Sequence, residues 1–164
     1  MRIIGIDPGL ATIGIGIIDV GTSMDDVQVV EWLTIETKAG MDLPLRLQEL
    51  HADLTGLIGE TGPEVAVVER LFFGTNERTA LDVAHARGVI LLALSQAGMP
   101  VLEPTPMQLK LAITGDGKAD KRQMQDMVAR MLQLAEMPSP DDAADGLALA
   151  VYGALHRSTL LAAG

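Results

Sequence analysis

Two carboxylates follow short apolar runs. Burying a charged group there costs free energy unless a positively charged group or ion pairs with it. Asp7 comes directly after residues 3–6, and Glu69 comes directly after Val65–Val68. If these runs are neighbouring parallel strands, both carboxylates lie at the same edge of a sheet, where open α/β sheets place their sites. Asp7 also begins an Asp-Pro-Gly sequence, which is typical of a turn. Turn formation alone would therefore explain an aspartate at this position.

Two further carboxylates, Asp142 and Asp145, are three residues apart and therefore share one face of a predicted helix. Ser139 is the expected N-cap, and Asp141 is assigned to capping because acidic side chains favour the positive end of a helix. Capping does not explain Asp145, which lies a turn further in among alanines and Gly146. These small neighbours would let the helix lie close against the sheet.

Four carboxylates brought together would repel one another strongly unless cations met them. Mg²⁺ or Mn²⁺ suits them, because hard divalent ions prefer carboxylate oxygen and keep waters for a phosphate substrate. Two such ions can activate a water and stabilise the departing oxygen in a displacement at phosphorus. An acid/base pair of the glycosidase kind needs only two carboxylates and usually brings sugar-stacking aromatics, which are scarce here. We therefore predict two-metal phosphodiester hydrolysis.

Hydrophobic periodicity predicts the elements that must position these residues. Their order is three strands, then helix, strand, helix, strand and three helices, which implies an α/β sheet with helices on both faces. Short connections favour an antiparallel meander for the first three strands. We expect one domain over 1–164, with strands at 2–6, 12–20, 27–37, 65–68 and 101–102 and helices at 43–58, 77–97, 106–113, 119–134 and 139–157.

The overall charge is acidic, which argues against nucleic acid as a partner. The chain has 12 Lys and Arg against 22 Asp and Glu, a net charge of −10. Residues 70–130 are the exception, with eight basic and six acidic side chains, so an anionic partner should meet this middle segment. The chain has no cysteine, which excludes disulfides, and no targeting segment is evident. We expect a cytoplasmic protein.

In their order along the chain, these and other motifs resemble the RuvC family of Holliday-junction resolvases. The resemblance covers nearly the whole sequence, and the first motif is shared by other RNase H-like proteins. The matching segments are Gly5-Ile6-Asp7-Pro8-Gly9, Asp42-Leu43-Pro44 with Arg46-Leu47, Val68-Glu69 with Phe72 and Asn76, Ala86-Arg87-Gly88-Val89, and Asp142-Ala143-Ala144-Asp145-Gly146-Leu147-Ala148.

The resemblance implies an RNase H-like fold with a mixed five-stranded sheet. It also implies a homodimer that binds four-way DNA junctions and nicks two strands of like polarity symmetrically, in recombination and DNA repair. The family suggests branch-migration partners of the RuvA and RuvB type. By motif match, the catalytic and metal-binding set is Asp7, Glu69, Asp142 and Asp145, although some relatives have His in place of Asp142.

Phe72 matches a family aromatic that stacks on a base near the junction centre. An ordinary core position is the alternative interpretation, and the adjacent Phe73 complicates the choice between them. The predicted helix at 77–97 is apolar almost all round at 89–94. The resemblance interprets this as one side packed on the sheet and the other on a second subunit, with burial inside one subunit as the alternative.

Several basic residues of the middle segment match DNA contacts in the family. Lys110 and Lys121 match lysines that face the DNA backbone near the scissile phosphate. Lys118, Lys121 and Arg122 gather at the start of a predicted helix, where phosphate also favours the helix N-terminus. A solvated basic face is the alternative. Arg78 is a further candidate for a DNA contact.

Two other functions stay open at this point. A RuvC-like nuclease acting on structured ribosomal RNA would share the fold, but the helix around 86–88 and the basic segment 118–122 favour the junction resolvase. A scaffold protein without catalytic activity would bind the same partner, four-way junction DNA. The presence of all four acids argues against the scaffold.

Overall fold

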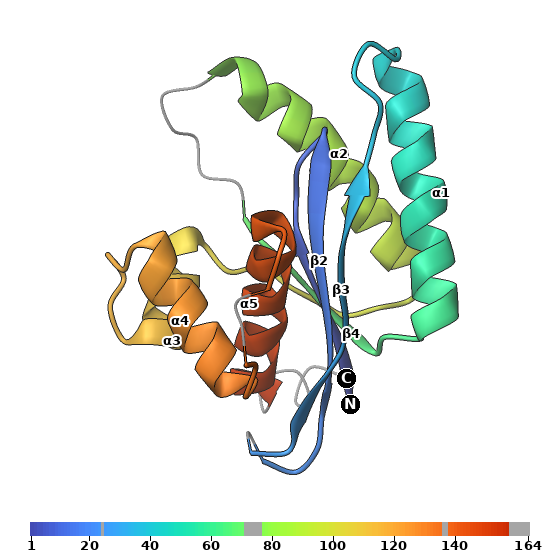
Figure 1. The fold of residues 1–164 in the computed structure, drawn as a ribbon. Coiled ribbons are helices and arrows are strands. Elements are labelled where there is room, and N and C mark those ends of the chain that lie inside the picture. The colour runs from blue at the N-terminus through green and yellow to red at the C-terminus, as the bar shows by residue number, and fades with distance from the viewer. Residues whose placement is uncertain (24, 71–76, 136–137, 158–164) are drawn as a thin grey trace.

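The computed structural model describes residues 1–23, 25–70, 77–135 and 138–157, and Figure 1 draws their arrangement. The predicted order of strands and helices is confirmed. Within the described ranges, no helix is long and apolar enough to cross a membrane.

The sheet has five strands in the order β3-β2-β1-β4-β5. β1 (Arg2–Asp7), β2 (Thr12–Val20) and β3 (Val27–Glu36) form the predicted antiparallel meander. β4 (Val65–Val68) pairs with the other side of β1, and β5 (Val101–Leu102) pairs with β4, both in parallel. The sheet is therefore mixed, as expected, and β1 is its central strand.

Helices cover both faces of this sheet, as Figure 1 shows. α1 (Leu43–Thr61) and α2 (Glu77–Gln96) lie side by side on one face. The other face carries α5 (Asp141–Leu155), with α3 (Pro106–Thr114) and α4 (Lys121–Met131) packed beside it. Both predicted layers of helices are confirmed.

The alternation of side chains along β1 decides which layer each residue meets. Ile4 and Ile6 belong to the apolar cluster beneath α1 and α2, whereas Ile3 belongs to the cluster beneath α5. Gly5 has the same parity as Ile3, and a Cβ built on it would lie 2.1 Å from a backbone oxygen of α5. Asp7 has this parity too, so the strand delivers its carboxylate to the α5 side of the sheet.

Close packing of α5 depends on small residues on both partners. A Cβ built on Gly16 of β2 would lie 2.4 Å from the backbone nitrogen of Leu147. A Cβ built on Gly146 of α5 would lie 2.6 Å from the carbonyl carbon of Ile15. Backbone therefore meets backbone here, which confirms the close approach predicted from the small residues of this helix.

Both ends of α4 differ from the predicted ones. α4 begins at Lys121, because Asp120 caps it by accepting a 2.9 Å hydrogen bond from the amide of Gln123. The helix stops at Met131 rather than 134, close to Gln133, whose φ of 53° no α-helix allows. Lys118 therefore lies three residues before the first residue of this helix rather than at its start.

The N-cap expected at Ser139 is wrong. Pro140 occupies that position and has no side chain that could accept a hydrogen bond, so α5 begins without a side-chain cap. The carbonyl oxygen of Ser139 instead accepts a 3.2 Å hydrogen bond from the indole of Trp32 on β3. Asp141 lies in the first turn of α5, as predicted, but its carboxylate contacts Gln125 and Lys121 of α4 instead of capping the helix.

Candidate active site

Asp7 and Glu69 end neighbouring parallel strands and point to the same face of the sheet. Ile6 and Val68 are register partners between β1 and β4, so the two carboxylates occupy the next position on each strand. The amide of Glu69 donates a 3.3 Å hydrogen bond to the carbonyl of Ile6, which continues the pairing past the end of β4. Both side chains line one cavity, and the predicted meeting of the two acids at one sheet edge is confirmed.

α5 brings its carboxylates to the same edge because it lies directly on the glycines of β2. Gly14 is the sheet partner of Asp7, and a Cβ built on it would lie 1.8 Å from the carbonyl oxygen of Asp142. Asp145, one turn further along the helix, lines the cavity with Asp7 and Glu69. Asp142 is not part of that lining, yet its charge is near enough to raise the pKa of Asp7.

The cavity has a volume of about 190 Å³ and a mixed wall. Its acidic side consists of Asp7, Glu69 and Asp145, and its basic side consists of Lys110 from α3 and Lys121 from α4. The apolar remainder comes from the same helices and α5, through Pro106, Leu109, Met124, Ala148 and Leu149. Residues from distant parts of the sequence thus form one site.

The pKa values show that negative charge in the site is poorly balanced. Burial is the largest cause that raises the pKa of Asp7 to about 7, and the charges of Glu69, Asp145 and Asp142 act in the same direction. Burial, and then the charge of Asp145, also raises the pKa of Glu69. Buried carboxylates that repel one another ionise readily only when more positive charge arrives.

Lys121 supplies part of that charge. Its ammonium group lies 3.3 Å from a carboxylate oxygen of Asp145 and 3.3 Å from one of Asp141. Burial still raises the pKa of Asp145, with Lys121 opposing the shift. Asp141 faces Lys121 and also accepts a 3.3 Å hydrogen bond from Gln125, and this tie between α4 and α5 replaces its predicted capping role.

The predicted DNA contacts fall into three groups. Lys110 and Lys121 line the cavity itself. Lys118 and Arg122 are exposed near the start of α4, outside the cavity lining. Phe72 lies outside the described residues, and so does the side chain of Arg78.

The donor chemistry of the site fits a hard divalent cation. Among the residues that the structure describes, no three His, Cys, Asp or Glu side chains are already drawn together tightly enough to enclose a metal ion. Three other carboxylates, those of Glu69, Asp142 and Asp145, are nevertheless near enough for their charges to raise the pKa of Asp7, which marks a local shortage of positive charge. Hard divalent cations bind oxygen donors and would supply the missing positive charge.

Sequence reasoning assigned no role to two arginines that hold the backbone of this edge. Arg87 of α2 donates a 3.1 Å hydrogen bond to the carbonyl oxygen of Glu69. Arg46 of α1 donates to the carbonyl oxygen of Leu10 at 3.2 Å and to the hydroxyl of Thr37 at 2.9 Å. Both arginines lie in segments that matched the family, but the spacing of a sequence does not reveal such long-range contacts.

The family described as crossover junction endodeoxyribonuclease RuvC matches residues 3–153 of the chain. The chain belongs to the RuvC family. The RuvC of Chloroflexus aurantiacus is 49% identical over 160 residues, which cover 98% of this chain and 96% of the relative. The RuvC of Brevibacillus brevis is 46% identical over 158 residues, which cover 96% of this chain and 94% of the relative.

Solved RuvC structures have the same fold. Thermus thermophilus RuvC superposes with a TM-score of 0.89 at 32% identity, covering 97% of this chain and 96% of that one. The same relative has been solved in complex with Holliday junction substrate, with the same TM-score and coverage. The predicted RNase H-like fold of the RuvC family is therefore confirmed.

Proposed function

We propose that this RuvC family chain is a structure-selective endonuclease that resolves four-way DNA junctions by divalent-metal-dependent phosphodiester hydrolysis. The observation that carries the proposal is the gathering of Glu69, Asp142 and Asp145 around Asp7 at one sheet edge. The curated relatives are named as crossover junction endodeoxyribonucleases, and the Thermus relative has been solved with a Holliday junction. These names favour a DNA junction over ribosomal RNA.

The proposed cofactor is Mg²⁺ or Mn²⁺, as two ions per site. Asp7, Glu69, Asp142 and Asp145 would hold it, and bound ions would activate a water and stabilise the departing oxygen. The ammonium group of Lys121 lies 3.3 Å from a carboxylate oxygen of Asp145, so it supplies countercharge to that carboxylate without a metal ion. A scaffold without catalysis would gain nothing from an acid such as Asp7, whose burial and acidic neighbours raise its pKa to about 7.

The basic residues would hold the DNA backbone at the site. Lys110 and Lys121 line the cavity and are placed to meet the scissile phosphate. Lys118 and Arg122 are exposed near the N-terminus of α4, where backbone amides also attract phosphate. Phe72 and Arg78 keep their predicted roles of base stacking and DNA contact.

Two symmetric cuts require two active sites, which we propose a homodimer supplies through α2. This helix buries Ile90 and Leu94 against its own sheet but leaves Leu81 65% exposed and Leu92 51% exposed. Val89 packs against the subunit's own core, so Leu81 and Leu92 form the outward apolar face. Branch-migration partners of the RuvA and RuvB type, and a place in the cytoplasm, remain predictions.

A cleavage assay tests the proposed function. The protein is incubated with a synthetic four-way junction, a linear duplex of the same sequence and a structured RNA, each with Mg²⁺, with Mn²⁺ or with a chelator. We expect paired nicks in the junction alone, and only when a divalent ion is present. Cleavage of the RNA in preference to the junction, or equal cleavage in the chelator, would overturn the proposal.

Asp7→Asn is the decisive variant in that assay, and Asp53→Asn is its control. Asp53 is exposed on α1, on the opposite face of the sheet, and loses the same charge. We expect Asp7→Asn to keep junction binding and to lose cleavage by at least about a hundredfold, since even outer-shell changes at metal sites cost up to that much. Asp53→Asn should cleave at the wild-type rate.

A further inference from the structure

The position of Glu69 depends on a short strand end. β4 has only four residues, and Glu69 follows the last of them. The side chain of Glu69 lines the same cavity as those of Asp7 and Asp145, so it lies among like charges. Something must hold the backbone of Glu69 in place if its carboxylate is to face a cation.

The amide of Glu69 bonds to Ile6 of β1, and Arg87 makes the contact that holds its carbonyl oxygen. Its Nε donates a 3.1 Å hydrogen bond to the carbonyl oxygen of Glu69. The next residue, Arg70, donates its amide to the carbonyl oxygen of Pro104 at 2.8 Å. The end of β4 is thus tied to α2 on one side and to the segment after β5 on the other.

Arg87 is itself held by Glu103. The far end of its guanidinium forms an ion pair with the Glu103 carboxylate, which follows directly after β5. The side chain of Arg87 is 16% exposed and that of Glu103 is 34% exposed, so the pair is largely shielded from solvent. A planar guanidinium with two such partners has little freedom to turn, because its donors point in fixed directions.

We propose that Arg87, anchored by Glu103, is a positioning residue that holds the backbone of Glu69 so that its carboxylate faces Asp7 across the cavity. This inference rests on the proposed role of Glu69 as a metal ligand. Arg87 does not line the cavity, and it binds the carbonyl oxygen rather than the carboxylate. The carboxylate therefore stays free for a cation, which a direct arginine–carboxylate pair would not allow.

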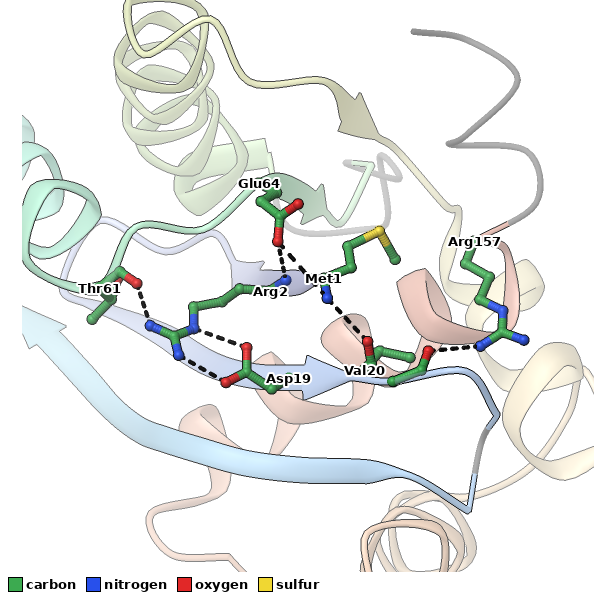
Figure 2. Close-up of polar contacts among 8 residues, drawn as sticks. Met1, Arg2, Asp19, Val20, Thr61, Glu64 and Arg157 are labelled. Carbon is green, nitrogen blue, oxygen red and sulfur yellow. Dashed lines mark hydrogen bonds and ion pairs between the residues drawn. The ribbon is translucent and has the colours of Figure 1, made fainter.

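The chain contains a matched pair for comparison at the other end of the sheet, which Figure 2 shows. Arg2 donates to the two carboxylate oxygens of Asp19 at 2.9 and 2.7 Å and also to the carbonyl oxygen of Thr61. It has the same set of partners as Arg87, one carboxylate and one backbone carbonyl. Arg2 begins β1 and Asp7 ends it, so this pair lies about 17 Å from the active site along the strand.

Titration of Mn²⁺ with the free ion counted by electron paramagnetic resonance tests the inference without requiring turnover. We expect R87Q to weaken Mn²⁺ binding about tenfold to a hundredfold, as outer-shell changes at metal sites do. The Mg²⁺ concentration that gives half-maximal junction cleavage should rise by a similar factor. R2Q should lose thermal stability while its Mn²⁺ affinity stays within about twofold of wild type, because it acts far from the ligands.

Two further variants separate the contact from the charge. R87K keeps the charge but loses the planar fork, so we expect its Mn²⁺ affinity to stay reduced. E103Q keeps the Glu69 contact but loosens its anchor, so we expect a smaller loss of affinity in the same direction. If R87Q does not fold, the Mn²⁺ affinities of E103Q and R87K test the inference instead.

The inference fails if R87Q binds Mn²⁺ as tightly as R2Q does, or if R87K restores wild-type affinity. E69Q distinguishes this failure from that of the proposed function. If E69Q loses Mn²⁺ affinity while R87Q keeps it, only the role of Arg87 is wrong. If E69Q binds Mn²⁺ like the wild type, Glu69 is not a ligand, and the inference fails together with the metal-binding role proposed for Glu69, while the cleavage assay still decides the proposed function.

Discussion

The amide of Glu69 donates to the carbonyl of Ile6 at 3.3 Å, one residue before Asp7. This bond fixes the register between the ends of β4 and β1. Because side chains alternate between the faces of a strand, a slip of one residue would turn one of the two carboxylates toward α1 and α2. The register of two short strands therefore decides whether the carboxylates of Asp7 and Glu69 line the same cavity.

The stability of the metal-free protein should fall as pH rises. The pKa of Asp7 is raised from its ordinary 3.8 to about 7, so the folded state retains a proton that the unfolded chain has released. The stability that this proton contributes is complete below the unfolded pKa and is lost as pH rises through about 7. Burial raises the pKa of Glu69 and Asp145 in the same direction.

Chemical denaturation in a chelator at pH 5 and pH 8 measures this effect. We expect the free energy of unfolding to be lower at pH 8 by about 2 to 4 kcal/mol, which is the size of a large carboxyl pKa shift. Asp7→Asn should reduce the difference, and saturating Mg²⁺ should restore the stability lost at pH 8. An equally steep dependence in Asp7→Asn would show that the carboxyl of Asp7 is not its source.

The contact between β2 and α5 should tolerate no side chain at Gly14. In Gly14→Ala the new Cβ would lie 1.8 Å from the carbonyl oxygen of Asp142, so the first turn of α5 has to move. We expect a loss of about 3 kcal/mol or more in the free energy of unfolding, together with loss of junction cleavage.

Gly59→Ala is the control for that substitution. Gly59 is an exposed position of α1 where an added Cβ would meet no atom within 4 Å. We expect it to stabilise the protein by about 0.5 to 1 kcal/mol, because alanine favours a helix interior over glycine. Equal stability of the two variants would contradict the backbone contact at Gly14.

These contacts show why much of the site could be predicted from the sequence. A run of four apolar residues before Glu69 indicates a strand covered on both faces, and a similar run precedes Asp7. That the two strands are parallel neighbours was a condition of the prediction, which the sheet pairing meets. The small residues around Asp145 indicate a helix that packs closely on a sheet. Each of these patterns is local, and each reports directly how a segment is buried.

The errors concern contacts between segments that are distant in the sequence. Asp141 looked like a capping residue because acids are common in the first turn of a helix, but its partner is Lys121 on α4. Ser139 is typical of an N-cap residue, but its carbonyl oxygen accepts a hydrogen bond from Trp32 of β3. The contact of Arg87 with Glu69 likewise joins α2 to β4, and no spacing within either element predicts it.

The exposed basic residues near the start of α4 should affect the affinity for junction DNA rather than the rate of cleavage. We expect Lys118→Gln and Arg122→Gln each to weaken junction binding and to reduce the slope of log affinity against log salt by about one. Cleavage at saturating protein should stay near the wild-type rate, because neither residue lines the cavity.

Arg157→Gln is the charge-matched control for the salt titration. Arg157 donates to backbone oxygens of Gly21 and Thr22, at the end of the sheet opposite Asp7. Its removal should leave the salt slope unchanged. A slope in Lys118→Gln or Arg122→Gln equal to that of the wild type would remove that residue from the DNA interface.

Self-association should depend on the outward face of α2. Leu92 is 51% exposed there, and Leu92→Lys would place a charge in the proposed interface. We expect this variant to change from twice the mass of one chain to a single chain in sedimentation or sizing experiments. Met107→Lys, at a 66% exposed position on α3, should leave the mass unchanged. A dimer that survives Leu92→Lys intact would move the interface away from this face.

The claim on which the rest depends is that carboxylates from β1, β4 and α5 bind divalent cations together. Crystals soaked in Mn²⁺ and measured at a wavelength where manganese scatters anomalously would locate the ions directly. We expect anomalous density against Asp7, with Glu69 and at least one of Asp142 and Asp145 as further ligands, and none there in Asp7→Asn. Density elsewhere on the molecule, with Asp7 bound to no ion at saturating Mn²⁺, would contradict the account.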